Sequence, residues 1–149
     1  MLPNDYQPER YQELLDEKLA NILPGFAAMG APEPEIFSSP PHSFRMRAEF
    51  RVWHDNDDLQ FVMFERAKPR EPITVSAFPF GSDGIQAVLE PLRVLLEGNH
   101  TLRTKLFQVE FLTTLSGECL VTLVYHRKLD DKWLQEASEV EQTLNIKVI

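Results

Sequence analysis

Apolar and polar residues alternate without a break along Ser43–His54. A period of two predicts a β-strand, because successive side chains of an extended chain point to opposite faces. The apolar positions are Phe44, Met46, Ala48, Phe50 and Val52. The opposite positions are Arg45, Arg47, Glu49, Arg51 and Trp53. One face of the strand is therefore suited to a hydrophobic core, and the other carries three guanidinium groups and an indole.

Helical spacing of apolar residues occurs in three other stretches. The first is residues 8–22, where Pro8 suits the first turn and Pro24-Gly25 is expected to stop the helix. The second begins after Ser82 or Asp83 and ends at Gly98, and the third begins after Asp130 and ends at Asn145. Their apolar stripes are Tyr11, Leu14, Leu15, Leu19 and Ile22; Ile85, Val88, Leu89, Leu92, Leu95 and Leu96; and Leu134, Ala137, Val140 and Leu144.

Further strands are predicted between these helices. Asp55–Asp58 is predicted to form a polar turn, and a return strand follows over Leu59–Arg66. A third strand is predicted over Ile73–Ala77, after a basic turn with Arg66, Lys68 and Arg70. A hairpin over Leu106–Leu115 and Cys119–Lys128 and a final strand over Ile146–Ile149 follow. The order α-βββ-α-ββ-α-β predicts an α+β fold, with about three helices packed on a mainly antiparallel sheet.

Two regions are expected along the chain. Residues 1–42 hold the first helix and an extended connector that contains Pro32, Pro34, Pro40 and Pro41. Residues 43–149 form the α+β core. An apolar strand at the very end, directly after a complete helix, suggests a piece cut from a longer protein.

The formal net charge of -8 is unevenly distributed. Residues 1–36 have a net charge of -5 and residues 129–149 a net charge of -3, so residues 37–128 are balanced. A balanced middle can present a basic face, and total charge therefore neither supports nor excludes a nucleic-acid partner.

Several other classes of function find no support in the residues. The apolar runs are too short for a membrane span, and the N-terminus lacks the features of a signal peptide. The one cysteine, Cys119, falls on an apolar strand face, and the four histidines share no metal-binding or triad spacing. We therefore expect no membrane contact, no metal site and no catalytic residue in these 149 residues, and a reducing, cytoplasmic setting.

A set of longer motifs is more specific than these patterns. They are Arg45-Met-Arg-Ala-Glu-Phe-Arg51, Trp53-His-Asp55, Leu106-Phe-Gln108, Leu112-Thr-Thr-Leu-Ser116, and Tyr125-His-Arg-Lys-Leu-Asp-Asp131 with Trp133. From about Tyr11 to the last residue, the chain resembles the amino-terminal part of the bacterial tRNA (uracil-5-)-methyltransferases. Enzymes of that family make ribothymidine in the T loop of tRNA.

The resemblance implies a two-part enzyme. An amino-terminal α+β region carries much of the RNA recognition, and a carboxy-terminal Rossmann-like domain binds S-adenosylmethionine and holds the catalytic cysteine and glutamate. No glycine-rich methyl-donor motif is found in this sequence, and Cys119 is not in the family's cysteine context. We therefore expect this chain to be the recognition region alone, truncated before the catalytic domain, and inactive by itself as a methyltransferase.

The implied partner is the T arm of tRNA, with tRNA-like RNAs such as tmRNA as a related class. On the family's pattern Phe107 and His126 face the RNA loop, and Arg51 lies in the matched arginine strand with Arg45 and Arg47. Residue patterns alone place Phe107 beside Val109 and Phe111, as a core aromatic. The alternative to RNA recognition is an α+β protein-interaction or structural domain, with the arginines serving a protein partner or internal ion pairs.

Overall fold

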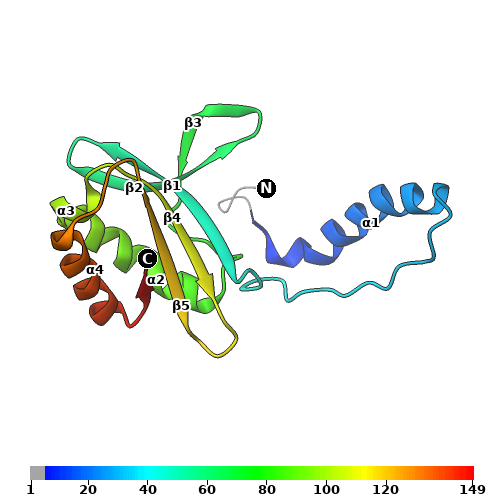
Figure 1. The fold of residues 1–149 in the computed structure, drawn as a ribbon. Coiled ribbons are helices and arrows are strands. Elements are labelled where there is room, and N and C mark those ends of the chain that lie inside the picture. The colour runs from blue at the N-terminus through cyan, green and yellow to red at the C-terminus, as the bar shows by residue number, and fades with distance from the viewer. Residues whose placement is uncertain (1–5) are drawn as a thin grey trace.

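A computed structural model describes residues 6–149 and shows one six-stranded sheet with helices on one side (Figure 1). The spatial order of the strands is β3-β2-β1-β4-β5-β6, and all neighbours are antiparallel except β5 and β6. The strands are β1 (Arg47–Asp55), β2 (Asp58–Glu65), β3 (Lys68–Thr74), β4 (Leu106–Thr113), β5 (Cys119–Tyr125) and β6 (Lys147–Val148). The helices are the 3-10 turn η2 (Pro8–Arg10), α1 (Tyr11–Ala28), α2 (Asp83–Gly98), the short α3 (His100–Arg103) and α4 (Asp131–Leu144). The predicted α+β class is confirmed.

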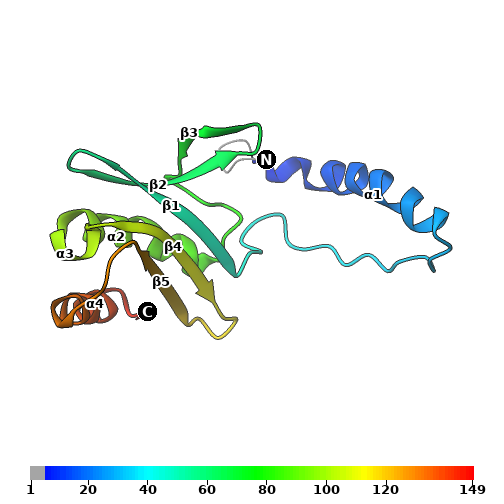
Figure 2. The same cartoon turned by 45° about the horizontal axis from the view of Figure 1, so that its top comes forward.

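The hydrophobic core lies between one face of the sheet and helices α2 and α4 (Figure 2). From β1 it receives Ala48, Phe50 and Val52, as the alternation predicted. Phe50 packs edge-on against Phe111 of β4, with ring centroids 5.9 Å apart. Because the helices cover one face only, the opposite face of β1, β4 and β5 stays open.

Residues that the sequence offers as helix caps do cap α2 and α4. The Ser82 hydroxyl accepts the backbone N–H of Ile85 at the start of α2, and the Asp130 carboxylate accepts that of Trp133 at the start of α4. Asn145, with φ 52°, closes α4 in the left-handed conformation. The predicted burial of Leu134 is wrong, since that side chain is 60% exposed and Trp133 occupies the buried position beside it.

The first strand begins later than predicted. Ser43 has a positive φ of 55°, and Arg45 makes only an isolated bridge to Gly81, so β1 starts at Arg47 rather than at Ser43. Phe44 and Met46 are consequently half-buried at the edge of the core.

The third strand begins and ends earlier in the chain than the predicted range Ile73–Ala77. The strand β3 pairs with β2 from Lys68 onward, through a two-residue turn over Arg66 and Ala67, and ends at Thr74. Pro69 and Pro72 are tolerated in β3 because it is an edge strand, where a missing backbone N–H need not break a ladder of hydrogen bonds.

The first helix passes through the predicted stop at Pro24 and ends only at Ala28. Across residues 11–28 no side chain is buried, so water can reach the backbone carbonyl that Pro24 leaves without a donor. Gly30, with φ 69°, then provides the stop, and the backbone N–H groups of Gly30 and Ala31 bond back to the last helical turn. As drawn in Figure 1, α1 points away from the sheet and the connector runs back to β1.

Candidate nucleic-acid interface

The open face of the sheet carries the polar half of the alternating strand. Arg47, Glu49, Arg51 and Trp53 are all exposed, and they alternate with the buried residues of β1. Neighbouring β4 adds Leu112, which is 48% exposed. A flat surface that mixes guanidinium groups with aromatic and apolar side chains suits a partner that offers both charge and ring faces.

Three of the five predicted RNA-binding residues lie together on this face. The guanidinium carbon of Arg51 lies 3.9 Å from the ring centroid of Phe107, and that ring lies 4.2 Å from the His126 ring at an interplanar angle of 55°. All three side chains are exposed, Phe107 to 37%. Arg51 has no carboxylate within ion-pair distance among residues 6–149. We refer to Arg51, Phe107 and His126 as the stacking row.

A β-bulge brings Phe107 into the stacking row. Leu106 pairs with Tyr125 and Gln108 pairs with Val124, so Phe107 is an extra residue between them. Leu106 therefore takes the inward position, at 2% exposure, and the Phe107 ring turns to the open face. The prediction of a core aromatic at 107 is wrong for this reason.

The bulge is held by hydrogen bonds from three directions. Lys105, just before it, has a positive φ of 57°, and its carbonyl accepts the His126 backbone N–H at 3.1 Å. The His54 ring donates from Nε2 to the Leu106 carbonyl at 2.9 Å. The Arg127 guanidinium donates to the carbonyls of residues 101 and 104. These contacts fix the backbone that leads into Phe107.

Arg47 and Arg45 have other surroundings. Arg47 lies 3.3 Å from the Glu110 carboxylate and 3.6 Å from that of Glu49, which stand directly opposite each other across β1 and β4. It therefore neutralises two like charges that would otherwise repel. Arg45 lies two residues before β1, where its guanidinium carbon is 5.6 Å from the centroid of the Phe80 ring. Both side chains are exposed.

Two further residues beside the stacking row were not predicted. Lys105 and His54 line a hollow of about 380 Å³ together with Phe107 and His126. Lys105 adds a cation whose position could have been inferred from its place just before the strand. His54 sits at the end of the alternating pattern, but its bond to Leu106 depends on a register that the sequence does not reveal.

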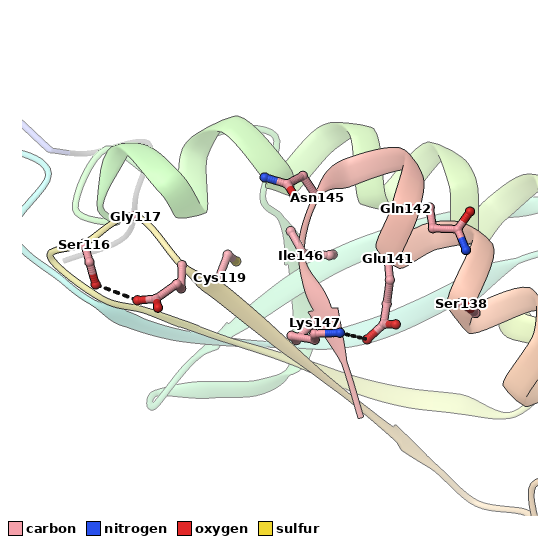
Figure 3. Close-up of a pocket in the computed structure, with 10 residues that line it drawn as sticks. Ser116, Gly117, Cys119, Ser138, Glu141, Gln142, Asn145, Ile146 and Lys147 are labelled. Atoms are coloured by element: carbon pink, nitrogen blue, oxygen red, sulfur yellow. Dashed lines mark hydrogen bonds and ion pairs between the residues drawn. The ribbon is translucent and has the colours of Figure 1, made fainter.

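A second hollow, of about 660 Å³, lies at the other end of the sheet between the β4–β5 turn, the end of α4 and β6 (Figure 3). Its carboxylates are already engaged. Glu118 accepts the hydroxyls of Thr114 and Ser116, and Glu141 accepts the Val148 N–H and lies 3.8 Å from the Lys147 ammonium. Nothing in this arrangement activates a nucleophile.

Cys119 borders that hollow but is only 8% exposed. Burial raises the pKa of its thiol, as expected for a small core residue. No cluster of three or more possible metal ligands occurs among residues 6–149. Over the same residues, every helix is too short or too polar to span a bilayer.

Comparison with known proteins identifies close relatives. A family model described as tRNA (Uracil-5-)-methyltransferase matches residues 10–149. The tRNA/tmRNA (uracil-C(5))-methyltransferase of Chromohalobacter salexigens is 48% identical over 147 residues, which is 96% of this chain and 39% of that protein. The proteins of the same name from Vibrio parahaemolyticus and Dechloromonas aromatica are 48% and 46% identical, over 95% and 97% of this chain. The chain spans about two fifths of the length of these relatives.

Proposed function

The chain belongs to the tRNA (uracil-5-)-methyltransferase family, and we propose that it is the RNA-recognition region of an enzyme that methylates C5 of the T-loop uridine of tRNA. The observation that carries this proposal is the stacking row. It offers one guanidinium group with no ion-pair partner among residues 6–149 and two exposed rings side by side on an open sheet face.

The chemistry of the stacking row fits a folded RNA loop. Sequence-tolerant binding of unpaired bases relies on aromatic faces for stacking and on arginine for charge, and RNA loops expose such bases. A uridine that is methylated at C5 must leave the stack of its loop, so neighbouring bases need other surfaces to hold them. In this proposal Phe107 and His126 provide that surface, and Arg51 and Lys105 neutralise adjacent phosphates.

The T arm of tRNA is the proposed partner, and the tmRNA named for the relatives is included because it is tRNA-like. S-adenosylmethionine would supply the methyl group. Rossmann-type sites place a glycine-rich turn between a parallel strand and a helix. The described residues 6–149 do not fit such a site, since Gly117 lies in a β-hairpin and the segment that joins the parallel strands β5 and β6, residues 126–146, contains no glycine. We therefore propose that a part of the enzyme outside these residues binds the methyl donor.

The alternative of internal ion pairs is favoured at one position only. Arg47 contacts two carboxylates, whereas Arg45 and Arg51 lie over aromatic rings. A surface built for ion pairing alone would not require the Phe107 ring to be turned outward.

A direct test compares two RNA hairpins in a filter-binding assay with the 149-residue chain. One hairpin reproduces a tRNA T arm, and the other an anticodon arm of equal length and charge. We expect tighter binding of the T arm at every salt concentration. Equal affinity for the two hairpins, or no binding of either, would refute the proposed role.

A further inference from the structure

A third hollow, of about 390 Å³, lies where the start of α1 meets the end of the sheet that is opposite to the stacking row. Aromatic rings form much of its wall. Tyr6 and Phe80 have ring centroids 4.5 Å apart, and Phe44 packs edge-on against Phe80 at 6.0 Å. Its volume lies within the range of pockets that bind small organic molecules, about 300 to 1,000 Å³.

The start of α1 is tied to the connector at this hollow. The Tyr11 hydroxyl accepts the Ser39 backbone N–H at 2.9 Å and lies 3.0 Å from the Ser39 hydroxyl. Tyr6, just before the helix, packs against the hydrophobic core. These contacts build a wall from residues that are distant in sequence, so the hollow depends on the fold and not on one loop.

Polar groups in the hollow are left without partners in the part of the chain that the structure describes. The Tyr6 hydroxyl is buried and makes no hydrogen bond there. Arg45 and Lys18 both line the hollow, and neither has a carboxylate within ion-pair distance among residues 6–149. Aromatic walls and two cations together match a flat ring that carries an anionic group.

We propose that this hollow binds one nucleotide of the bound RNA, with the base among the rings of Tyr6, Phe44 and Phe80 and the phosphate on Arg45 and Lys18. The inference rests on the proposed function, which supplies the RNA. Its location supports an RNA nucleotide over a free one, because Arg45 lies just ahead of the strand that carries Arg51. Six residues at no more than about 3.3 Å each place Arg45 within about 20 Å of Arg51. One RNA hairpin can contact both places.

Photocrosslinking tests the proposal directly. T-arm hairpins with 4-thiouridine placed at single positions are bound to the 149-residue chain, irradiated and mapped by mass spectrometry. We expect one position to crosslink to a peptide that contains Tyr6, Phe44 or Phe80, and a different position to crosslink at Phe107 or His126. Lys18→Ala should abolish the first crosslink and preserve the second.

Binding measurements complete the test. Lys18→Ala and Arg45→Ala should each lower the slope of log affinity against log salt by about 0.7, as for one lost phosphate contact. Lys132→Ala, on the helix-covered side of the sheet, is the matched control and should leave the slope unchanged. Lys18 is exposed on α1, so its replacement spares the core even if Arg45→Ala unfolds the chain.

Three outcomes would overturn the inference. Crosslinks confined to Phe107 and His126, with unchanged slopes for Lys18→Ala and Arg45→Ala, would reject the nucleotide site and leave the proposed function intact. Saturable binding of uridine 5′-monophosphate that T-arm RNA cannot displace would assign the hollow to a free nucleotide. Failure of the unmodified chain to bind the T-arm hairpin would reject the proposed function, and the inference with it.

Discussion

The Phe107 ring lies 4.2 Å from the His126 ring, although Phe107 belongs to β4 and His126 follows the end of β5. Their contact exists because a bulge turns Phe107 outward at the level where β5 ends and His126 begins the exposed loop. The two exposed rings thereby form one continuous surface beside Arg51.

Removing either ring should weaken RNA binding without changing its dependence on salt. Phe107→Ala and His126→Ala are each expected to reduce T-arm affinity by about 1 to 3 kcal/mol, the range for loss of one base–aromatic stack. Filter binding over a series of salt concentrations measures both quantities. Leu112→Ala, an exposed apolar residue of the same face, is the control. A loss of affinity as large for Leu112→Ala would show that exposed apolar area, and not ring stacking, is responsible.

Replacing Arg51 and replacing Arg47 should have different effects on RNA binding, because only Arg47 already contacts carboxylates. Arg51→Ala is expected to lower the salt slope by about 0.7, because Arg51 is free to neutralise a phosphate. Arg47→Ala should have a smaller effect on the slope, since Glu49 and Glu110 already neutralise that guanidinium. It should instead cost stability through the repulsion of the two opposed carboxylates. The same titrations, combined with urea unfolding, distinguish the two roles, and an equal slope change for both variants would contradict them.

Cys119 should react slowly with thiol reagents in the folded protein. Its side chain is buried, and burial raises its pKa, so both access and thiolate content are low. Labelling with an aromatic disulfide reagent at pH 7, followed with and without urea, provides the measurement. We expect labelling at the rate of unfolding in buffer and rapid labelling in urea. Rapid labelling without denaturant would contradict the buried position.

Glu97 should make stability depend on pH. The Leu59 backbone N–H and the Arg93 guanidinium hold its pKa below the ordinary value, so folding favours the carboxylate. Its contribution is complete above the unfolded-state pKa of about 4.3 and is lost as pH falls through the lower folded pKa.

Glu97→Gln is therefore expected to cost about 1 to 2 kcal/mol at pH 7, and the difference from the unmodified chain should shrink toward pH 3. Urea unfolding at the two pH values measures this, with the exposed Glu139→Gln as the control. A difference that stays constant with pH would mean that the carboxylate charge is irrelevant.

Periodicity predicted the layers of this fold well. Alternation placed Ala48, Phe50 and Val52 inward and the arginines outward, and the 3.6-residue stripe of α2 was correct because both depend only on local geometry. Cap residues Ser82 and Asp130 were likewise readable from sequence, since one hydroxyl or carboxylate suffices to start a helix.

Features set by neighbouring segments were not predictable in this way. The inward and outward sides of Leu106 and Phe107 depend on one extra residue opposite β5, and nothing in the local pattern marks it. Pro69 and Pro72 could be placed in a strand only once β3 was known to lie at the sheet edge. The contact between Arg51 and Phe107 joins β1 to β4, so the sequence could name both residues but not their stacking.

The central claim is that the stacking row binds the bases of an RNA loop. The most direct test is whether the chain distinguishes an intact loop from a loop without bases. Fluorescence anisotropy would compare a T-arm hairpin with a hairpin of identical stem whose loop bases are replaced by abasic sites, for the unmodified chain and for the Phe107→Ala/His126→Ala double variant. We predict that the unmodified chain prefers the intact loop and that the double variant binds both hairpins equally, with its circular dichroism spectrum unchanged. A double variant that retains the full preference for the intact loop would contradict the account.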